Sequence, residues 1–235
     1  MNGYGSPFAN ITPVVKNLLI INVIFYIATM LFTEFMVRYF GVFYFGSPYF
    51  KVWQIITYMF MHSPGTFFHI LFNMFALFSF GSTLEYYFGS KRFLNFYLIT
   101  GLGALALQMA VQAFEIYSIA GSITVYPEML MHYAADDVNK IREIYSTPML
   151  GASGAIFGLL VAFGMLFPNA ELMIFLIPFP IKAKYIIPIY IVIELFAGVA
   201  QFAGDSVAHF AHLGGALFGF ILIKLWGIRR PGGFL

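Results

Sequence analysis

Long apolar segments recur along the whole chain, and they constrain its fold more than any other feature. Of the 235 residues, 61% are hydrophobic and 9% are charged, whereas an ordinary soluble domain has about 25% charged residues. Each apolar segment is about 20 residues long, which matches a hydrocarbon core about 30 Å thick. The composition therefore predicts an all-α membrane protein that folds as one integral domain.

Six of these segments are predicted to span the bilayer, which would place both termini on the same side. The predicted spans are 17–36, 67–88, 93–114, 149–167, 185–202 and 207–226. With the N-terminus inside, eight lysine and arginine residues fall in inner segments and four in outer segments. Cytoplasmic segments carry an excess of these residues, so the predicted topology is N-in/C-in.

The remaining residues form two ends and two prominent connections. Residues 1–16 are predicted to be a short cytoplasmic arm, 17–228 the membrane domain and 229–235 a cytoplasmic tail. Aromatic residues are dense in 38–66, and this first loop is predicted to lie partly in the membrane interface, where amphipathic rings are favoured. The acidic segment 115–148 is predicted to be a long outer loop, part of which forms a surface helix.

Composition also excludes several classes of function and location. The chain has no cysteine, so disulfides, thiol chemistry and cysteine metal sites are excluded. The net charge of +2 is too small to indicate a nucleic-acid partner. The first apolar segment is too long for a cleavable signal peptide. Because the chain is compact and shows no targeting segment, we expect the bacterial cytoplasmic membrane, with the functional site toward its outer face.

Polar side chains lie inside three of the predicted spans. His69 and Asn73 are in the second, Ser153 is in the fourth, and His209 and His212 are in the sixth. Such groups are costly in lipid and face a protein interior or a water-filled cavity. In the predicted topology all three spans enter from the outer face, and the polar groups lie about 5–10 Å below it at ~1.5 Å per residue. Their shared depth predicts a single site.

Glycines explain how two of these spans could approach each other. They occur in pairs four residues apart, Gly154 with Gly158 and Gly215 with Gly219. Pairs of small residues at this spacing let membrane helices pack closely. His212 shares a helix face with Gly215 and Gly219. A tight crossing of the fourth and sixth spans would therefore carry His212 toward Ser153, while Gly151 eases the turn before the serine.

The residue types indicate acyl-transfer chemistry. A serine hydroxyl needs a base to take its proton, and histidine is the usual base near neutral pH. No acidic residue lies near His212 in the sequence, so a Ser153–His212 dyad is more economical than a triad. His69, Asn73 and the backbone N–H of Ser153 would donate to a developing oxyanion, at about 2.7–4 kcal/mol for each donor. Glu194, inside the fifth predicted span, is a functional candidate by default, but a structural or cavity-facing role is preferred.

These residues resemble the motifs of the rhomboid family of intramembrane serine proteases. The motifs are Gly151-X-Ser153-Gly154, His69-X-X-X-Asn73 and Ala211-His212-X-X-Gly215-X-X-X-Gly219, in the family's order and on its second, fourth and sixth spans. The resemblance covers about residues 17–226. It implies a rhomboid-like six-helix bundle in which Ser153 is the nucleophile and His212 the general base. The implied activity is cleavage of membrane-anchored proteins in or near their transmembrane segment.

The resemblance also bears on residues around the site. His69 and Asn73 would help to form the oxyanion hole, and Gly151 would contribute to it. Phe157 stands where some bacterial members carry a tyrosine that packs on the catalytic histidine, so the packing should be kept and one hydrogen bond lost. His209, one turn outward from His212, is expected to be interfacial or supporting. Glu85 and Arg92 would form a stabilising pair on the cytoplasmic side. Apart from the resemblance, His62 is expected at the surface.

Three other functions compete with this prediction. A catalytically dead relative that binds transmembrane clients would be expected to lose the serine or the histidine, and both are present. A transporter or channel would favour inverted repeats with broken helices in matching halves, and no matching repeat is found in the sequence. An intramembrane metalloprotease would need a His-Glu-X-X-His motif, which is missing. The expected partners are single-span transmembrane substrates and the lipid bilayer, with no metal, cofactor or nucleic acid.

Overall fold

The computed structural model describes residues 11–65, 67–173, 179–200 and 208–230. It confirms the predicted all-α membrane protein. Among the described residues, four helices are long and apolar enough to cross a membrane, and two further apolar helices are shorter. The four are Pro13–Leu31 (α1), Phe67–Phe88 (α4, η3 and α5), Ser90–Ala120 (α6) and Ala183–Ala200 (α9). The two are Ser153–Leu166 (α8) and His209–Leu225 (α10).

Each predicted span corresponds to one of these helices, and some boundaries differ. The number of helices that cross the bilayer and their orientation stay predictions. The expected boundaries at Phe202 and Val207 lie outside the described residues, as do most of the arm 1–16 and of the tail 229–235.

Smaller elements complete the fold. The span Phe67–Phe88 consists of α4 (Phe67–Ala76), a π-helical stretch η3 (Leu77–Gly81) and α5 (Ser82–Phe88). The connections contain α2 (Thr33–Phe40), α3 (Gln54–Thr57), η2 (Tyr58–Phe60), η4 (Pro127–His132) and α7 (Ala135–Ser146). The only sheet in the described part of the chain is an antiparallel pair of two-residue strands, β1 (Glu171–Leu172) and β2 (Ile181–Lys182).

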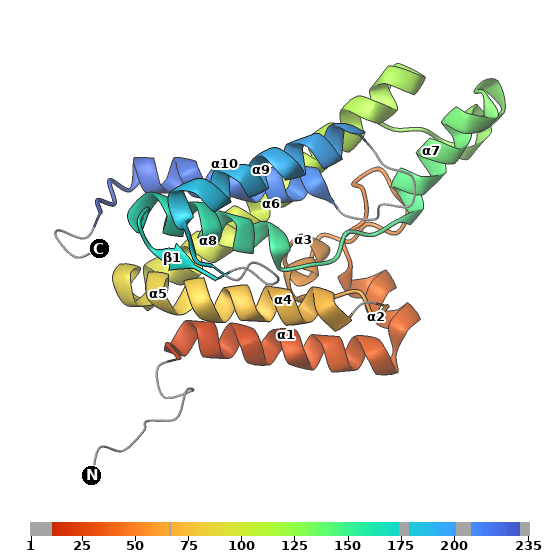
Figure 1. The fold of residues 1–235 in the computed structure, drawn as a ribbon. Helices are drawn as coiled ribbons and strands as arrows, with labels where there is room; N and C mark the ends of the chain where they lie inside the picture. The colour runs from red at the N-terminus through yellow and green to blue at the C-terminus, as the bar shows by residue number, and fades with distance from the viewer. Residues whose placement is uncertain (1–10, 66, 174–178, 201–207, 231–235) are drawn as a thin grey trace, which may run out of the picture.

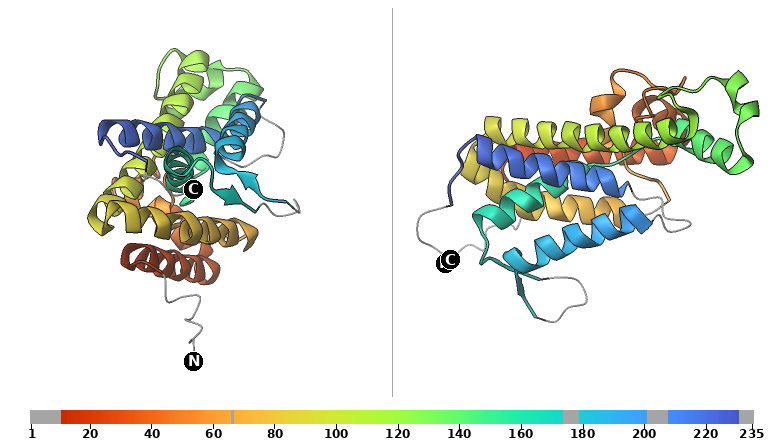
Figure 2. Two further views of the ribbon diagram at one scale, coloured as in Figure 1. Left: turned by 60° about the vertical axis from the view of Figure 1, so that its left-hand side comes forward. Right: turned by 90° about the horizontal axis from the view of Figure 1, so that it is seen from above.

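The helix α8 occupies the centre of the bundle. Ten of its 14 residues are buried, and it contacts α4, α5, α6, α9 and α10. The left-hand view of Figure 2 shows α8 end-on in the middle of the bundle. By contrast, α1 and α9 expose large apolar side chains, such as Ile24 and Phe196, on their outer faces. Exposed apolar side chains on the outer helices are expected when lipid surrounds the bundle.

Glycines set the close approach of α10 to α8. A methyl group at Gly219 would lie 2.7 Å from the carbonyl oxygen of Gly158, and one at Gly215 would collide with the backbone of Gly154. The crossing predicted from the paired glycines is therefore present. The two glycines of α8, Gly154 and Gly158, were expected to make room for α10. Their missing side chains instead make room for α6, where Thr100 lies against Gly158.

The first loop is a folded part of the bundle. The Gln54 side chain is buried and donates to the carbonyl of Arg38 at 3.0 Å, and the Trp53 indole donates to the carbonyl of Tyr39 at 2.8 Å. Val42 pairs with Met149 in an isolated antiparallel bridge. The loop thus holds the chain that leads into α8.

The connection predicted as the outer loop 115–148 begins later than expected, because the preceding helix is longer. α6 continues to Ala120 and ends at Gly121, whose φ of +67° favours glycine. α7 corresponds to the surface helix expected there. A small apolar cluster joins this region to the first loop, with Tyr44, Ile116, Val125, Ile141 and Ile144 buried together.

The two ends of the described chain lie on one side of the bundle. In Figure 1, α1 begins and α10 ends at the left, while α7 lies at the right. At this left end, Glu85 accepts hydrogen bonds from the backbone N–H groups of Val14 and Val15 at 3.0 and 2.9 Å. The implied pair of Glu85 with Arg92 is not formed, because the Arg92 guanidinium lies over the Trp226 ring, 5.9 Å from its centroid. Glu85 therefore caps α1.

Candidate active site

Ser153 is presented at the first residue of α8. Before it, Gly151 has a φ of +143°, a conformation that side chains rarely adopt, and its N–H donates to the Tyr58 carbonyl at 3.0 Å. The backbone turns from the extended bridge at Met149 into the helix at this point. The first N–H groups of an α-helix have no partner within the helix, so the start of α8 can attract developing negative charge.

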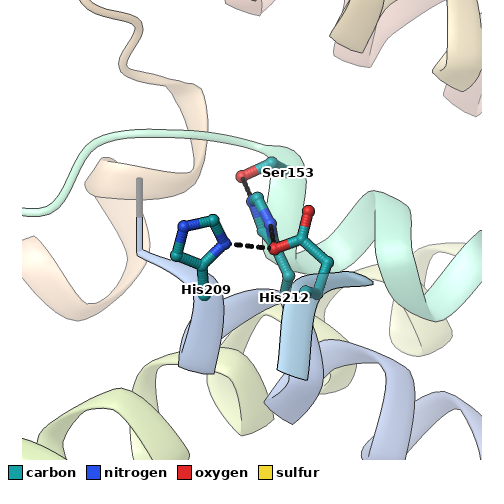
Figure 3. A network of polar contacts seen from close by, with 4 residues as sticks. Ser153, His209 and His212 are labelled. Atoms are coloured by element: carbon teal, nitrogen blue, oxygen red, sulfur yellow. Dashed lines mark hydrogen bonds and ion pairs between the residues drawn. The ribbon is translucent and has the colours of Figure 1, made fainter. Parts of the chain in front are cut away.

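His212 of α10 reaches this serine. Its Nε2 lies 2.8 Å from the Ser153 Oγ, and Figure 3 shows the two side chains pointing at each other. The His212 side chain is buried. The Phe157 ring, one turn along α8, stacks on the imidazole with 4.3 Å between centroids and 8° between planes. The ring packing implied by the resemblance is present.

A third side chain meets this pair and was missed as a partner by the sequence reasoning. Glu194 of α9 is 5% exposed, and its Oε2 lies 2.9 Å from the His212 Nδ1 and 2.7 Å from the His209 Nδ1. His209 is thus a neighbour of the site and not an interfacial residue alone. The available signal was an ionisable residue inside an apolar span, which is functional by default. A structural or cavity-facing role is preferred from the sequence because a Ser–His dyad needs no carboxylate and no acidic residue is near His212 in the chain; Glu194 precedes it by 18 residues.

The same three side chains offer possible metal ligands. Glu194, His209 and His212 each present a ligand atom, and these atoms lie within 4.8 Å of one another. Ligands of a tetrahedral zinc ion at ~2.0–2.1 Å would be about 3.3 Å apart. The Oε2 to Nδ1 distances of 2.7 and 2.9 Å are shorter and match hydrogen bonds. The arrangement therefore fits a hydrogen-bonded network better than a bound metal ion.

Gly151 lies close to both Ser153 and His69. A methyl group at Gly151 would lie 3.3 Å from the Ser153 Oγ and 3.6 Å from the His69 Nε2. The absence of a side chain at Gly151 thus leaves room between the two groups. Asn73 is buried one turn below His69, and its Nδ2 donates to the His69 carbonyl at 2.9 Å. One of its N–H groups is therefore already occupied within the helix.

His62 corrects an expectation from the sequence. It was expected at the surface, but it is 0% exposed, and its ring lies 5.4 Å from the His69 ring. Burial, and to a smaller extent the neighbouring His69, lower the pKa of His62 to about 3. The first loop therefore supports the His69 side of the site with a neutral imidazole.

The comparisons with known proteins agree with the motifs. A family model of the rhomboid domain matches residues 49–229. Rhomboid protein 1, mitochondrial, of Saccharomyces cerevisiae is 32% identical over 71% of this chain and 39% of its own length. Rhomboid protease AarA of Providencia stuartii is 29% identical over 72% of this chain and 54% of its own length. The human presenilin-associated rhomboid-like protein, mitochondrial, is 27% identical over 83% of this chain and 44% of its own length.

The chain thus spans 39% to 54% of the length of these relatives. The matched region runs from the first loop to the end of α10 and includes α4, α8 and α10, which carry His69, Ser153 and His212. Because the family model covers this whole region of the fold, the chain belongs to the rhomboid family.

Proposed function

We propose that this protein is an intramembrane serine protease in which Ser153 is the nucleophile and His212 the general base. The observation that carries the proposal is the 2.8 Å contact between Ser153 Oγ and His212 Nε2. The two residues lie on different helices and are 59 residues apart in the chain. Membership of a family with a relative named a protease supports the same activity.

The chemistry follows from the positions of the donors and acceptors. The His212 Nε2 takes the proton of Ser153 Oγ as that oxygen bonds to the scissile carbonyl carbon. The carbonyl oxygen becomes negatively charged in the space beside Gly151, where the Ser153 N–H, His69 and Asn73 would donate to it. Donors of this kind are each worth about 2.7–4 kcal/mol in the transition state. His212 then gives its proton to the leaving amide nitrogen, and water completes the hydrolysis of the acyl-enzyme.

The substrates we propose are single-span transmembrane proteins, cleaved in or near that segment. The site lies between helices whose outer faces are apolar, and Phe196 of α9 is 66% exposed. A helix-shaped apolar substrate can approach such a surface through lipid. The proposed topology is N-in/C-in, with the site toward the outer face of a bacterial cytoplasmic membrane. The named relatives come from both mitochondria and a bacterium, so fractionation of the native organism is the test of location.

The activity is tested with the full chain in proteoliposomes and a single-span reporter substrate. Ser153→Ala and His212→Ala are expected to abolish cleavage, and a fluorophosphonate probe is expected to label Ser153, as mapped by mass spectrometry. Ser118→Ala is the matched control, because Ser118 is exposed near the end of α6. Cleavage by Ser153→Ala at the wild-type rate would show that this proposed function is wrong.

A further inference from the structure

Glu194 has no part in the two-residue mechanism proposed above, yet it contacts the base. We infer that Glu194 is a positioning residue for His212, so that the site works as a Ser153–His212–Glu194 triad. This inference rests on the proposed function and deepens it. It adds a carboxylate from α9 to a site that the motifs assign to α4, α8 and α10 alone.

The contacts form a continuous line of three groups. The Ser153 Oγ lies 2.8 Å from the His212 Nε2, and the Nδ1 of the same ring lies 2.9 Å from the Glu194 Oε2. A neutral imidazole carries a proton on one nitrogen and a lone pair on the other. With the proton on Nδ1, the ring donates to the carboxylate, and the Nε2 lone pair faces the serine hydroxyl. With the opposite tautomer, two acceptors would face each other at 2.9 Å.

The carboxylate therefore selects the tautomer that can act as a base. It has a second effect when His212 takes the serine proton, because the ring then becomes a cation beside a buried anion. A hydrogen bond between charged groups is about twice as strong as one between neutral groups, and both side chains are largely removed from water. Glu194 stays ionised throughout and neither gains nor loses a proton.

His209 holds the carboxylate in this orientation. Its Nδ1 lies 2.7 Å from the same Oε2 that faces His212, and it stands one turn before His212 on α10. Two imidazoles from one helix thus fix a single oxygen of Glu194 against α10. A carboxylate with only one partner would be free to rotate away from the base.

The backbone of α9 is placed for this contact by Gly198, four residues after Glu194 and on the same helix face. A methyl group at Gly198 would lie 3.1 Å from the His209 Cβ and 3.4 Å from the Phe210 ring. Glycine at this position lets α9 approach α10 closely next to the two histidines. This close approach is a second observation that points to the same contact.

Glu85 is a buried carboxylate with a structural role in the same fold. It is 2% exposed, and it accepts from the backbone N–H groups at the start of α1 and from the Ser90 hydroxyl at 2.6 Å. These partners hold the start of α1 and the start of α6. Glu194 instead accepts from two imidazoles, one of which touches the serine. Glu85 is therefore the matched control for Glu194.

The test compares the steady-state kinetics of Glu194→Gln, Glu194→Ala and Glu194→Asp with those of Glu85→Gln, using the reconstituted full chain and the same reporter. Glu194→Gln and Glu194→Ala are expected to lower kcat by about 100-fold or more, because loss of the orienting acid in a serine triad costs up to ~10⁴ in kcat. KM should change little. Glu194→Asp should recover part of the kcat. Glu85→Gln should lower the Tm and leave the kcat of the folded protein unchanged.

A Glu194→Gln kcat close to that of the wild type would overturn the inference, whether or not the Tm falls as expected for Glu85→Gln. That outcome would leave the proposed function unaffected, because the proposed function is tested separately by Ser153→Ala. Treatment with EDTA should leave kcat unchanged, and a change would mean that the three side chains hold a metal ion instead.

A second measurement keeps the inference testable if the Glu194 variants do not fold. In ¹⁵N-histidine-labelled protein with Ser153→Ala, the NMR signals of His212 report which ring nitrogen carries the proton. We expect a protonated Nδ1 in a strong hydrogen bond, with the signal assigned by its loss in His212→Asn. A neutral His212 with its proton on Nε2 would overturn the inference.

Discussion

The Phe157 and His212 rings lie face to face, with 4.3 Å between their centroids and only 8° between their planes. The imidazole is thus clamped on one face by an aromatic ring from the next turn of the helix that carries Ser153. Its edge is held at the same time by contacts to Ser153 and Glu194. The orientation of the base therefore depends on packing as well as on hydrogen bonds.

Replacing this ring should slow the reaction as well as destabilise the fold. Phe157→Leu is expected to lower kcat by about tenfold or more, because small misplacements of reacting groups are costly. Phe163→Leu is the matched control, since Phe163 is buried on the same helix and packs on Phe80 away from the site. Both variants should lower the Tm by similar amounts. Equal kcat values for the two variants would show that the stack has no role in positioning His212.

Gly151→Ala should abolish activity for two separate reasons. The residue has a φ of +143°, so a side chain there costs about 1–3 kcal/mol in backbone strain. The added methyl group would also enter the space between Ser153 Oγ and His69. Gly121→Ala separates the two effects, because Gly121 has a φ of +67° and nothing within 4 Å. Steady-state cleavage and Tm should show a stability loss in both variants and a loss of kcat in Gly151→Ala alone.

Gly219→Ala should disrupt the crossing of α8 and α10. Its methyl group would lie 2.7 Å from the Gly158 carbonyl oxygen and 2.8 Å from the Gly158 Cα. Backbone atoms cannot move aside as a flexible side chain can, so the helices must separate and draw His212 away from Ser153. Fluorophosphonate labelling of Ser153 should fall together with the Tm. Leu217→Ala, at an exposed position on α10, should label at the wild-type rate.

His62 should make the protein less stable in mild acid. Its pKa is about 3 in the folded protein and about 6.5 in an unfolded chain. Between these values the unfolded state binds the extra proton, so the free energy of unfolding decreases as the pH falls below about 6.5. At pH 5 the loss should be about 2 kcal/mol relative to neutral pH. His62→Gln should reduce the difference in Tm between pH 7 and pH 5 in detergent micelles, and an unchanged difference would contradict the assignment.

The apolar helices could be predicted from the sequence because hydrophobic length is a local property. The predicted span 67–88 and the observed helix Phe67–Phe88 coincide. Other observed helix boundaries differ from the predicted ones where tertiary contacts extend or interrupt a helix. α6 continues to Ala120 because Ile116 packs against residues of α7. α8 begins only at Ser153 because Met149 is held by Val42 and Gly151 by Tyr58.

The pairing of Ser153 with His212 could also be predicted from the sequence. Two glycine pairs at helical spacing and polar groups at one depth were enough to predict which helices cross. The buried position of His62 could not be predicted, because nothing in a mixed aromatic segment indicates how a loop folds back on the bundle. Its burial depends on contacts with residues of other elements, including His69.

The sequence by itself determined an α-helical membrane protein and predicted that a serine and histidines lie at one depth, because span length, glycine spacing and residue type are all local. Only the tertiary structure decided that Glu194 meets His212. That contact joins α9 to α10 across 18 residues of sequence, and it depends on the side chain's direction and on the close approach at Gly198. A periodic pattern records which face of a helix is apolar, but not which side chain of a neighbouring helix will meet it.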